Sequence, residues 1–371
     1  MKKILIIRSN PVNPDSRVEK EAWALCKNEY SVSILAWDRE YNHKVNKDYL
    51  TFDGTKVPIY RVGFKASYGE GFKNIMPYIR FQKEIISFIK NNKYDIIHAC
   101  DFDTALSSIV IAKIKRIKFI FDIFDFIYGN PKNLFEKLIK KIEIQIANNS
   151  DAVIICTEER KRQIKESKPK KTIVVHNTPS KKQLTKEEVI VEKSKKIKIC
   201  YIGILQDGRL LDEIGKYFSE HNEEELYIGG FGKYEAYFRD LSEHYPNIKY
   251  FGKISYGKTL YIESMCDIML GIYDPKIENH KYAAPNKFYE SLFVGKPIIM
   301  VKNTGMSSIV KDNNIGILID YNINSFAEGL KILIDRKKEW PNMKKRMNNL
   351  YEDSYNWSIM ESRLLKLYEE L

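Results

Sequence analysis

Lys287 and Glu290 could together hold a ligand. They follow a loop at Pro285, because proline fixes its own φ angle and disfavours helix at the preceding residue. Asn286 suits the N-cap of a short helix over residues 287–294, and residues three apart in a helix share a face. A cation and a carboxylate at a helix start suit a ligand with both phosphate and hydroxyl groups. A surface ion pair of little energetic value accounts for the same spacing.

This stretch resembles a known family. Residues 285–290 (Pro-Asn-Lys-Phe-Tyr-Glu) and 295–299 (Gly-Lys-Pro-Ile-Ile) are similar to the donor-site segment of GT-B glycosyltransferases, in particular the retaining family 4 type. The resemblance implies that Glu290 holds the ribose hydroxyls of a nucleotide-sugar. Many members carry another glutamate eight positions earlier, where this chain has Tyr282, so the sugar contact of that glutamate is not carried over.

A loop in the second half of the chain suits a diphosphate. It follows the predicted strand 197–202 and contains Gly203, which lets the backbone approach a phosphate, and Arg209, which can bind one through two nitrogens. The resemblance assigns this loop to the donor diphosphate, residues 252–255 to the nucleotide base, and residues 302–305 to sugar and phosphate. The predicted donor-binding residues are Gly203, Arg209, Lys253, Ile254, Asn286, Lys287, Glu290, Thr304 and Gly305.

Transfer of a sugar leaves charge on the departing diphosphate, which Arg209 and Lys287 would stabilise. With two cations in that place, we expect no metal and no cofactor. Retention at the anomeric carbon is implied by the resemblance alone.

The segment 121–125 (Phe-Asp-Ile-Phe-Asp) departs from the family. The resembling subgroup has Tyr-Asp-x-His-Glu, with the histidine near the reacting sugar and phosphate, whereas this chain has Phe124 in its place. A phenyl ring can neither transfer a proton nor donate a hydrogen bond. Either Asp122 or Asp125 takes the polar role, which makes both candidate catalytic residues, or the reaction relies on the donor's own phosphate. Altered chemistry and an inactive member also fit this departure.

Strands and helices alternate over residues 1–178, which is typical of a parallel, doubly wound sheet. Ligands of such sheets bind beyond the carboxyl ends of the strands, here the loops 9–17, 100–103 and 123–130. Arg17 either faces an anionic ligand or pairs with Glu21, one turn along its helix. The predicted acceptor-binding residues are Asn10, Arg17, Asp101 and Asp103.

Two other kinds of site are disfavoured. The loop 9–17 contains no glycine, so it is no dinucleotide fingerprint. Asp101 and Asp103 form an Asp-x-Asp pair, which binds a metal diphosphate in a different transferase class. We reject that interpretation, because Asp103 and Thr104 are also expected to cap the next helix and the resemblance implies a metal-free fold. His98, at a strand end, is expected as a packed core residue.

The length of 371 residues suits two domains. We predict an α/β protein with two Rossmann-like, doubly wound parallel-sheet domains facing across a cleft, the GT-B fold. The domains are 1–178, which binds the acceptor, and 197–356, which binds the nucleotide-sugar; residues 179–196 form a polar linker. The helix 357–371 is expected to pack back onto the first domain. In the helix predicted over 130–148, the apolar residues Leu134, Leu138, Ile142 and Ile146 are expected to face the core.

Composition indicates a cytoplasmic location. The chain is 44% hydrophobic and 30% charged, as in ordinary globular proteins, and no apolar run approaches the roughly 20 residues of a membrane span. The first strand, 4–7, is too short for a signal peptide. The five cysteines form no Cys-x-x-Cys motif, so we expect reduced thiols.

The positive charge lies in the first half of the chain. Residues 1–185 hold 34 Lys and Arg against 21 Asp and Glu, whereas the remainder has a net charge of −1. Nucleic acid, an anionic membrane, an anionic acceptor or a merely lysine-rich composition would each explain this. No nucleic-acid-binding motif is present, which favours peripheral attachment to the inner face of the cell membrane.

The predicted function is transfer of a hexose from a nucleotide-diphosphate sugar, with UDP-sugar favoured, to a hydroxyl of a glycan or polyprenyl-linked acceptor. The resemblance and the charge suggest polysaccharide biosynthesis for the cell envelope. One alternative is a non-catalytic GT-B partner subunit. The other is a sugar-nucleotide 2-epimerase, which needs carboxylates and a histidine around the sugar, so Phe124 disfavours it.

Overall fold

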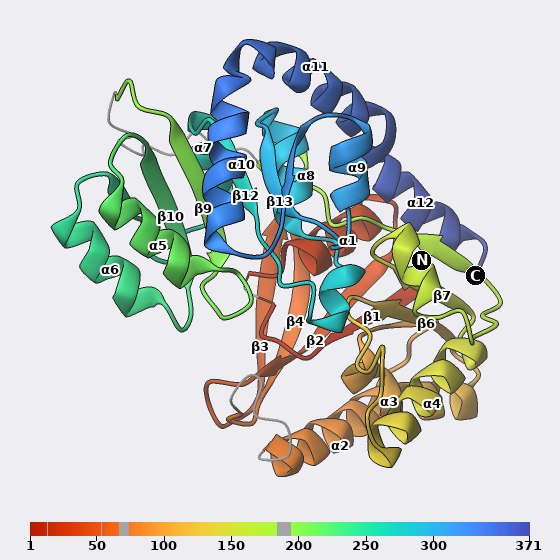
Figure 1. The fold of residues 1–371 in the computed structure, drawn as a ribbon. Helices are drawn as coiled ribbons and strands as arrows, with labels where there is room; N and C mark the ends of the chain where they lie inside the picture. Colours follow the sequence, from red (N-terminus) through yellow and green to blue (C-terminus); the bar gives the residue numbers. More distant parts are fainter. Residues whose placement is uncertain (13, 53, 67–73, 184–193) are drawn as a thin grey trace. The chain divides into compact units, whose positions relative to one another are not determined.

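The computed structural model describes residues 1–12, 14–52, 54–66, 74–183 and 194–371 (Figure 1). The chain divides into two compact units, Met1–His176 with Met360–Leu371 and Asn177–Ile359. The last helix, α12 (Trp357–Glu369), thus lies mostly within the first unit. Of the predicted linker 179–196, residues 184–193 lie outside the described residues.

The first unit is built on an eight-stranded sheet of order β3-β4-β2-β1-β5-β6-β7-β8. All neighbouring strands are parallel except the β3–β4 pair, a hairpin that the sequence analysis missed. The eight strands, apart from the polar and mostly exposed β3 and the mixed β4, run as near-continuous apolar segments because both faces of a parallel sheet are covered. They are β1 (Lys3–Arg8), β2 (Ser31–Asp38), β3 (His43–Phe52), β4 (Thr55–Gly63), β5 (Ile96–Cys100), β6 (Lys118–Ile123), β7 (Ala152–Ile155) and β8 (Thr172–Val174).

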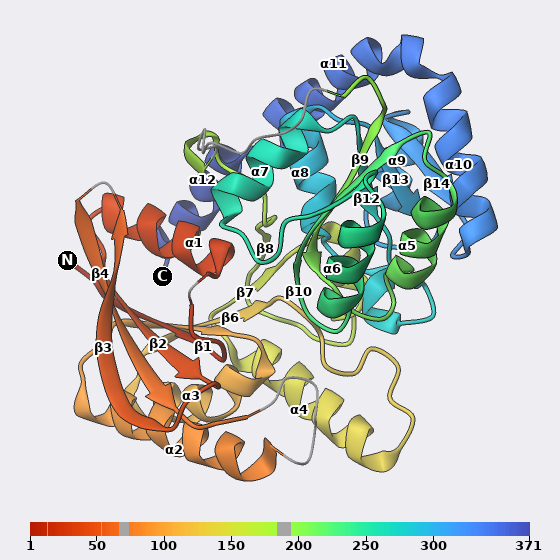
Figure 2. The same cartoon turned by 90° about the vertical axis from the view of Figure 1, so that its left-hand side faces the viewer.

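Helices cover both faces of this sheet. α2 (Ile75–Asn91), α3 (Phe102–Lys115) and α4 (Leu134–Asn149) bury their apolar sides in one core with alternate strand residues such as Ile97 and Phe121 (Figures 1 and 2). The intervening residues, including His98 and Asp122, point to the opposite face, where α1 (Ser16–Lys27) and α12 provide their partners.

The second unit has a wholly parallel six-stranded sheet of order β11-β10-β9-β12-β13-β14. Its strands are β9 (Lys198–Ile204), β10 (Glu225–Phe231), β11 (Ile248–Tyr250), β12 (Ile268–Gly271), β13 (Ile298–Val301) and β14 (Gly316–Ile319). Its α-helices are α5 (Leu211–Glu220), α6 (Glu235–His244), α7 (Tyr256–Met265), α8 (Asn286–Val294), α9 (Ser307–Asp312), α10 (Ile323–Asp335) and α11 (Trp340–Leu350). Separate apolar cores on the two faces make this sheet doubly wound as well, so the predicted fold class is confirmed.

The predicted core stripe of α4 is wrong in its first half. Leu134 is 83% and Leu138 53% exposed, whereas Ile146 and the unpredicted Glu143 are buried. The reason is geometric. With 3.6 residues per turn, each step of four residues turns about 40° around the axis, so a row of such steps winds away from one face.

Candidate active site

The predicted pair of Lys287 and Glu290 forms, and it is buried. Lys287 Nζ lies 2.5 Å from Glu290 Oε2 and 3.0 Å from Glu263 Oε1 on the neighbouring helix α7. Glu290 is 1% and Glu263 0% exposed. The surface-pair explanation of the spacing therefore does not apply. Glu263 was missed because nothing near position 287 in the sequence indicates it.

This cluster places one ammonium group between two carboxyl groups. Burial, with the charge of Glu290, raises the pKa of Glu263 well above its ordinary value. Burial alone would lower the pKa of Lys287, but the two carboxyl groups more than compensate and raise it. Burial beside Glu290 also raises the pKa of the Tyr256 phenol. Lys287 thus stays charged between the two carboxyl groups.

The backbone at the end of β9 lies against this cluster. A Cβ atom added to Gly203 would lie 3.7 Å from Cε of Lys287, and one added to Gly230 would lie 1.7 Å from the carbonyl oxygen of Gly203. Gly230, with φ of +126°, is therefore required for β9 and β10 to approach here. Gly203 itself presents no side chain here, and the atoms nearest to that position belong to the side chains of Tyr201 and Lys287, at 3.5 Å and 3.7 Å.

Arg209 is held by the loop that follows β12. Its Nη1 lies 3.0 Å from Nε2 of His280, and its guanidinium carbon lies 3.7 Å from the centre of the Tyr273 ring. His280 Nδ1 lies 2.9 Å from the carbonyl oxygen of Asp274 and must donate to it, which leaves Nε2 as the acceptor for Arg209. His280 was not among the predicted residues, although a histidine in the loop leading to the predicted donor segment was a usable signal.

The same loop reaches the end of β13. Gly305 N donates to the carbonyl oxygen of His280 at 2.9 Å, and a Cβ on Gly305 would lie 2.0 Å from the carbonyl oxygen of Ala283. Thr304 is buried and its hydroxyl donates to Val301 O at 2.7 Å. Arg209 and Gly305 therefore both contact the segment around His280.

The remaining predicted donor residues lie nearby in the chain's second unit. Lys253, after β11, lies with Nζ 5.2 Å from the centre of the Phe231 ring, and Ile254 packs against the core that contains α8. Asn286 begins α8, and its Oδ1 accepts from Asn177 at 3.1 Å. Like the others, these residues follow the carboxyl ends of strands or begin the helix beyond one, where parallel sheets bind ligands.

On the first unit, the carboxyl ends of β1, β5 and β6 meet through Asp101. Its Oδ1 accepts from the backbone N–H groups of Phe124 at 2.8 Å and Asp125 at 3.1 Å, while Oδ2 pairs with Arg8. Asp101 has φ of 69° and ψ of 167°, a region that is almost exclusive to glycine. Three interactions through one side chain hold this strained backbone in place. Burial raises the pKa of Asp101 to about 6.

Phe124 lies against two cations. The guanidinium carbons of Arg8 and Arg17 are 4.2 Å and 4.5 Å from the centre of its ring. Arg8, which the sequence analysis missed although it ends a predicted strand, also donates from Nε to Asp15 Oδ2 at 2.9 Å. The position of the family histidine is thus filled by an aromatic face that packs on arginines.

Arg17 and Asp122 form a buried, bidentate ion pair. Arg17 Nη2 lies 2.7 Å and 2.9 Å from the two oxygens of Asp122, and Nε lies 3.1 Å from Glu21. Arg17 is 2% exposed and Asp122 is 0% exposed. The pairing alternative for Arg17 is therefore realised, and neither side chain is open to an acceptor.

His98 is a packed core residue, as expected. Its Nε2 donates to Asp122 at 3.2 Å, and its Nδ1 accepts from the Tyr368 hydroxyl of α12 at 2.7 Å. Ligand-type atoms of His98, Cys100 and Asp122 lie within 4.8 Å of one another. Because Arg17 already neutralises Asp122 and both nitrogens of His98 are hydrogen-bonded, this cluster is accounted for as structural.

The other predicted acceptor-side residues are more exposed. The side chain of Asp125 is 69% exposed and pairs with Arg160 at 2.7 Å, whereas that of Asp103 is 25% exposed. Asn10 donates to Asp15 at 2.8 Å. Among the predicted carboxylates of this edge, Asp125 is the most accessible.

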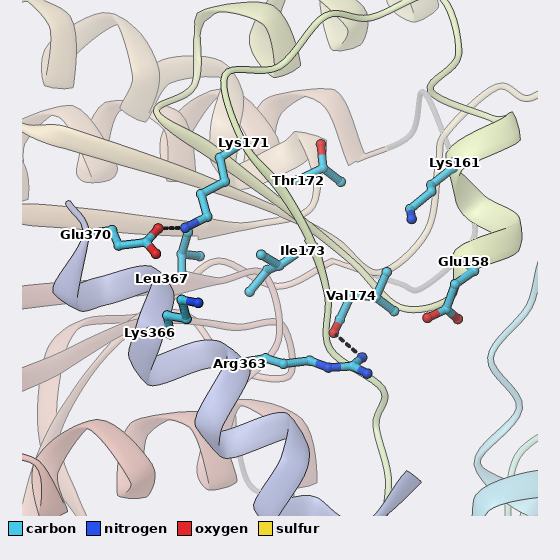
Figure 3. A pocket seen from close by; sticks show the side chains of 10 residues that line it. All are labelled: Glu158, Lys161, Lys171, Thr172, Ile173, Val174, Arg363, Lys366, Leu367 and Glu370. Carbon is cyan, nitrogen blue, oxygen red and sulfur yellow. Dashed lines mark hydrogen bonds and ion pairs between the residues drawn. The ribbon is translucent and has the colours of Figure 1, made fainter. Parts of the chain in front are cut away.

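A pocket of about 410 Å³ lies elsewhere on the first unit, between β8 and α12 (Figure 3). Its lysines and arginine are partly engaged by the protein. Lys171 pairs with Glu370, and Arg363 donates to Val174 O at 3.1 Å. No predicted site residue lines this pocket.

Two further observations concern membrane-spanning helices and the cysteines. In the part of the chain that the structure describes, helices are too short or too polar to cross a bilayer. The five cysteines are free thiols, and all except Cys26 are buried.

Comparisons with known proteins agree with this architecture. Residues 17–178 match the model of glycosyltransferase family 4, and residues 157–352 match that of glycosyl transferases group 1. A search of curated protein sequences found no match.

Several solved structures share the whole fold. Sucrose-phosphate synthase from Thermosynechococcus elongatus has a TM-score of 0.77 at 13% identity, covering 100% of this chain and 99% of that one. Anabaena HepE, solved with UDP and with UDP-glucose, has a TM-score of 0.69 at 11% identity, with 100% of both chains covered. A UDP-N-acetylglucosamine 2-epimerase from Listeria monocytogenes has 0.67 at 14%, covering 100% and 96%. The family match and the shared architecture show that this chain belongs to the glycosyl transferases of group 1 and has the GT-B fold.

Proposed function

We propose that this glycosyltransferase transfers a hexose from a nucleotide-diphosphate sugar to a hydroxyl of a glycan or polyprenyl-linked acceptor, with retention and without a metal. The observation that carries the proposal is the cluster of Lys287, Glu290 and Glu263 against the backbone of Gly203. A buried cation beside a glycine backbone suits a diphosphate, and a carboxylate suits ribose hydroxyls. UDP is favoured because HepE binds UDP and UDP-glucose.

On the donor side, Lys287 and Arg209 would stabilise the leaving diphosphate. Glu263 and His280 act as positioning residues, since each holds one of these cations at 3.0 Å. Glu290 would accept hydrogen bonds from the ribose. Gly203, Lys253, Ile254, Asn286, Thr304 and Gly305 complete the proposed donor site.

On the acceptor side, Asp125 is the proposed hydroxyl-binding or catalytic carboxylate because its side chain is 69% exposed. Asp101, Asp103 and Asn10 would bind or position the acceptor together with Arg8. The burial of Arg17 and Asp122 gives these two residues a structural role in the proposal, in place of the direct contacts expected from the sequence. With Phe124 unable to transfer a proton, the donor phosphate would receive the proton of the acceptor hydroxyl.

Calorimetry with UDP, GDP and ADP tests the donor site. Wild type should bind one of these nucleotides, and Glu290→Ala should weaken that binding. Glu220→Ala, which removes an exposed carboxylate paired with Lys216 on α5, serves as the matched control and should bind as wild type. Absence of nucleotide binding in wild type would remove the basis of the proposal.

Product analysis separates the alternatives. A transferase releases UDP and lengthens an acceptor, whereas an epimerase returns a changed UDP-sugar. The fold shared with the Listeria epimerase keeps that alternative as the second candidate. A non-catalytic partner subunit would bind nucleotide and give neither product.

A peripheral location on an anionic membrane belongs to the same proposal. A polyprenyl-linked acceptor resides in a bilayer, and residues 1–185 hold 34 Lys and Arg against 21 Asp and Glu.

A further inference from the structure

Three helices of the first unit expose large apolar side chains. On α4, Leu134 is 83%, Phe135 48% and Leu138 53% exposed. On α3, Val110 is 54% and Ile114 72% exposed. The corresponding residues of α2 are Ile75, Met76 and Ile79, at 48%, 58% and 39%. Side chains of this kind usually pack inside a protein, so their concentration on three helices requires an explanation.

These side chains lie on one surface. α2, α3 and α4 lie side by side on the same face of the sheet (Figures 1 and 2). Their opposite sides, represented by Phe81, Ala112 and Ala147, are buried in one core with the strands. The exposed stripes therefore point away from the sheet together. We call the solvent-facing side of these three helices the outer helical face.

The fully exposed charged side chains of this face are basic. Within α2, α3 and α4, all of whose residues the structure describes, the exposed charged side chains are exclusively cations. They are Arg80, Lys83 and Lys90 on α2, Lys113 and Lys115 on α3, and Lys137 and Lys141 on α4. The acidic residues of these helices are half-buried or buried, as in the case of Glu143.

Cations and apolar side chains alternate along the exposed stripe of α4. On α4 the order is Leu134, Lys137, Leu138 and Lys141, spaced three, one and three residues apart along one side of the helix. A nucleic-acid-binding surface would account for the cations but not for the exposed leucines. A protein–protein interface would account for the leucines but not for so many cations. Long basic side chains can place their ammonium groups among head groups while the apolar residues reach the acyl chains.

We infer that the outer helical face binds the surface of a bilayer that contains anionic phospholipid. The cations would contact the acidic head groups, and Leu134, Phe135 and Leu138 would enter the boundary of the acyl region. The inference deepens the proposed function, on which it rests for its biological purpose, because a polyprenyl-linked acceptor is presented at such a surface. The binding itself needs neither donor nor acceptor.

Vesicle co-sedimentation of the full chain tests this inference. Wild type should bind vesicles of phosphatidylcholine with phosphatidylglycerol in low salt, release them in high salt, and bind pure phosphatidylcholine vesicles much less. Because each lysine near an anionic surface contributes about fivefold, Lys113→Glu/Lys137→Glu/Lys141→Glu should weaken the partition coefficient at least about 100-fold. The control Lys216→Glu/Lys331→Glu/Lys338→Glu makes the same charge change at exposed residues of the second unit and should bind as wild type.

A second pair of variants tests the apolar component. Leu134→Ser/Leu138→Ser should weaken partitioning roughly tenfold without lowering stability, since both side chains are exposed. Met265→Ser/Ile332→Ser, at exposed apolar residues of the second unit, is the control and should have no effect. Circular dichroism and thermal unfolding check the fold of every variant.

Four outcomes would overturn the inference. These are no binding in low salt, equal binding to neutral vesicles, equal loss in the control variants, or self-association in solution that Leu134→Ser/Leu138→Ser abolishes while no vesicle binding occurs. UDP calorimetry on the same samples separates the two proposals. Failure to bind vesicles with intact UDP binding overturns this inference alone, whereas vesicle binding without any nucleotide binding overturns the proposed donor site alone.

Discussion

Lys287 Nζ lies 3.0 Å from Glu263 Oε1, which joins the first turn of α8 to a residue of α7 that lies 24 positions earlier. Glu290 takes the opposite side of the same ammonium group at 2.5 Å. Since all three side chains are at most 9% exposed, their charges interact in a medium much less polar than water. The proposed donor cluster is therefore expected to contribute to the stability of the fold as well.

Lys287→Met should lower the free energy of unfolding by about 3–5 kcal/mol at neutral pH, because it leaves buried carboxyl groups without their cation. Lys287→Met/Glu263→Gln should recover part of that loss. Lys216→Met is the control, since Lys216 and its partner Glu220 are 73% and 56% exposed and such pairs contribute about 0–1 kcal/mol. Urea unfolding measures all four proteins. Equal losses for Lys287→Met and Lys216→Met would contradict the buried cluster.

How far the sequence predicts this cluster depends on distance along the chain. Lys287 and Glu290 share a helix face, so their pairing follows from local geometry. Glu263 enters only through the packing of α7 on α8, for which no local pattern exists. The same holds for the contact between Arg209 and His280, which are 71 positions apart. Helix geometry thus predicted the pairing of Lys287 with Glu290. It gave no indication of Glu263 or His280, which position the cations.

The first unit shows the same limit. Alternation of apolar strands and helices predicted its parallel sheet, but the polar hairpin β3–β4 carries burial at few positions and gave no signal. The row from Leu134 to Ile146 appeared regular in the sequence and yet winds around α4. Asp101 was predicted as a ligand-binding residue from its place after a strand, whereas its positive φ angle of 69° depends on Arg8 and on the backbone of residues 124–125.

His280→Ala should weaken UDP binding about 10-fold, because Arg209 loses the acceptor that orients its guanidinium. Arg209→Ala, which also removes the phosphate contact, should weaken it about 100-fold. The double variant should bind no worse than Arg209→Ala, since His280 acts through Arg209. Calorimetry measures these affinities, with His244→Ala, on the exposed part of α6, as the control. Additive losses would show that His280 contacts the nucleotide itself.

Asp101→Gly should be more stable than Asp101→Ala by about 1–2 kcal/mol, although both lose the same side-chain bonds. Only glycine adopts φ of 69° with ψ of 167° without strain. The difference in the free energy of unfolding between the two variants therefore measures the cost of the strained backbone at residue 101. Both variants should lose transferase activity, because the backbone N–H groups of Phe124 and Asp125 lose their acceptor. Chemical denaturation gives the stability difference. Equal stability of the two variants would rule out backbone strain at this residue.

Stability should fall as the pH rises from about 4.5 to about 8, partly through Glu143. Burial raises the pKa of Glu143 from 4.5 to about 8, and Oε1 has no hydrogen-bond partner among the described residues. The folded protein therefore holds this proton more tightly than the unfolded chain, so the stabilisation is complete below pH 4.5 and is lost as the pH rises through 8. Burial raises the pKa of Glu21 to about 7, which acts in the same direction.

Glu143→Gln should flatten this pH dependence by up to a few kcal/mol, because an amide is neutral at every pH and still accepts the N–H of Ile127. Glu166→Gln, at a carboxylate with 55% side-chain exposure, should leave the slope unchanged. Urea unfolding at intervals between pH 4 and pH 9 gives the free energy of unfolding for wild type and both variants. The expected order is that wild type and Glu166→Gln lose stability together toward alkaline pH while Glu143→Gln loses less. A wild-type slope retained in Glu143→Gln would show that the pH dependence does not come from Glu143.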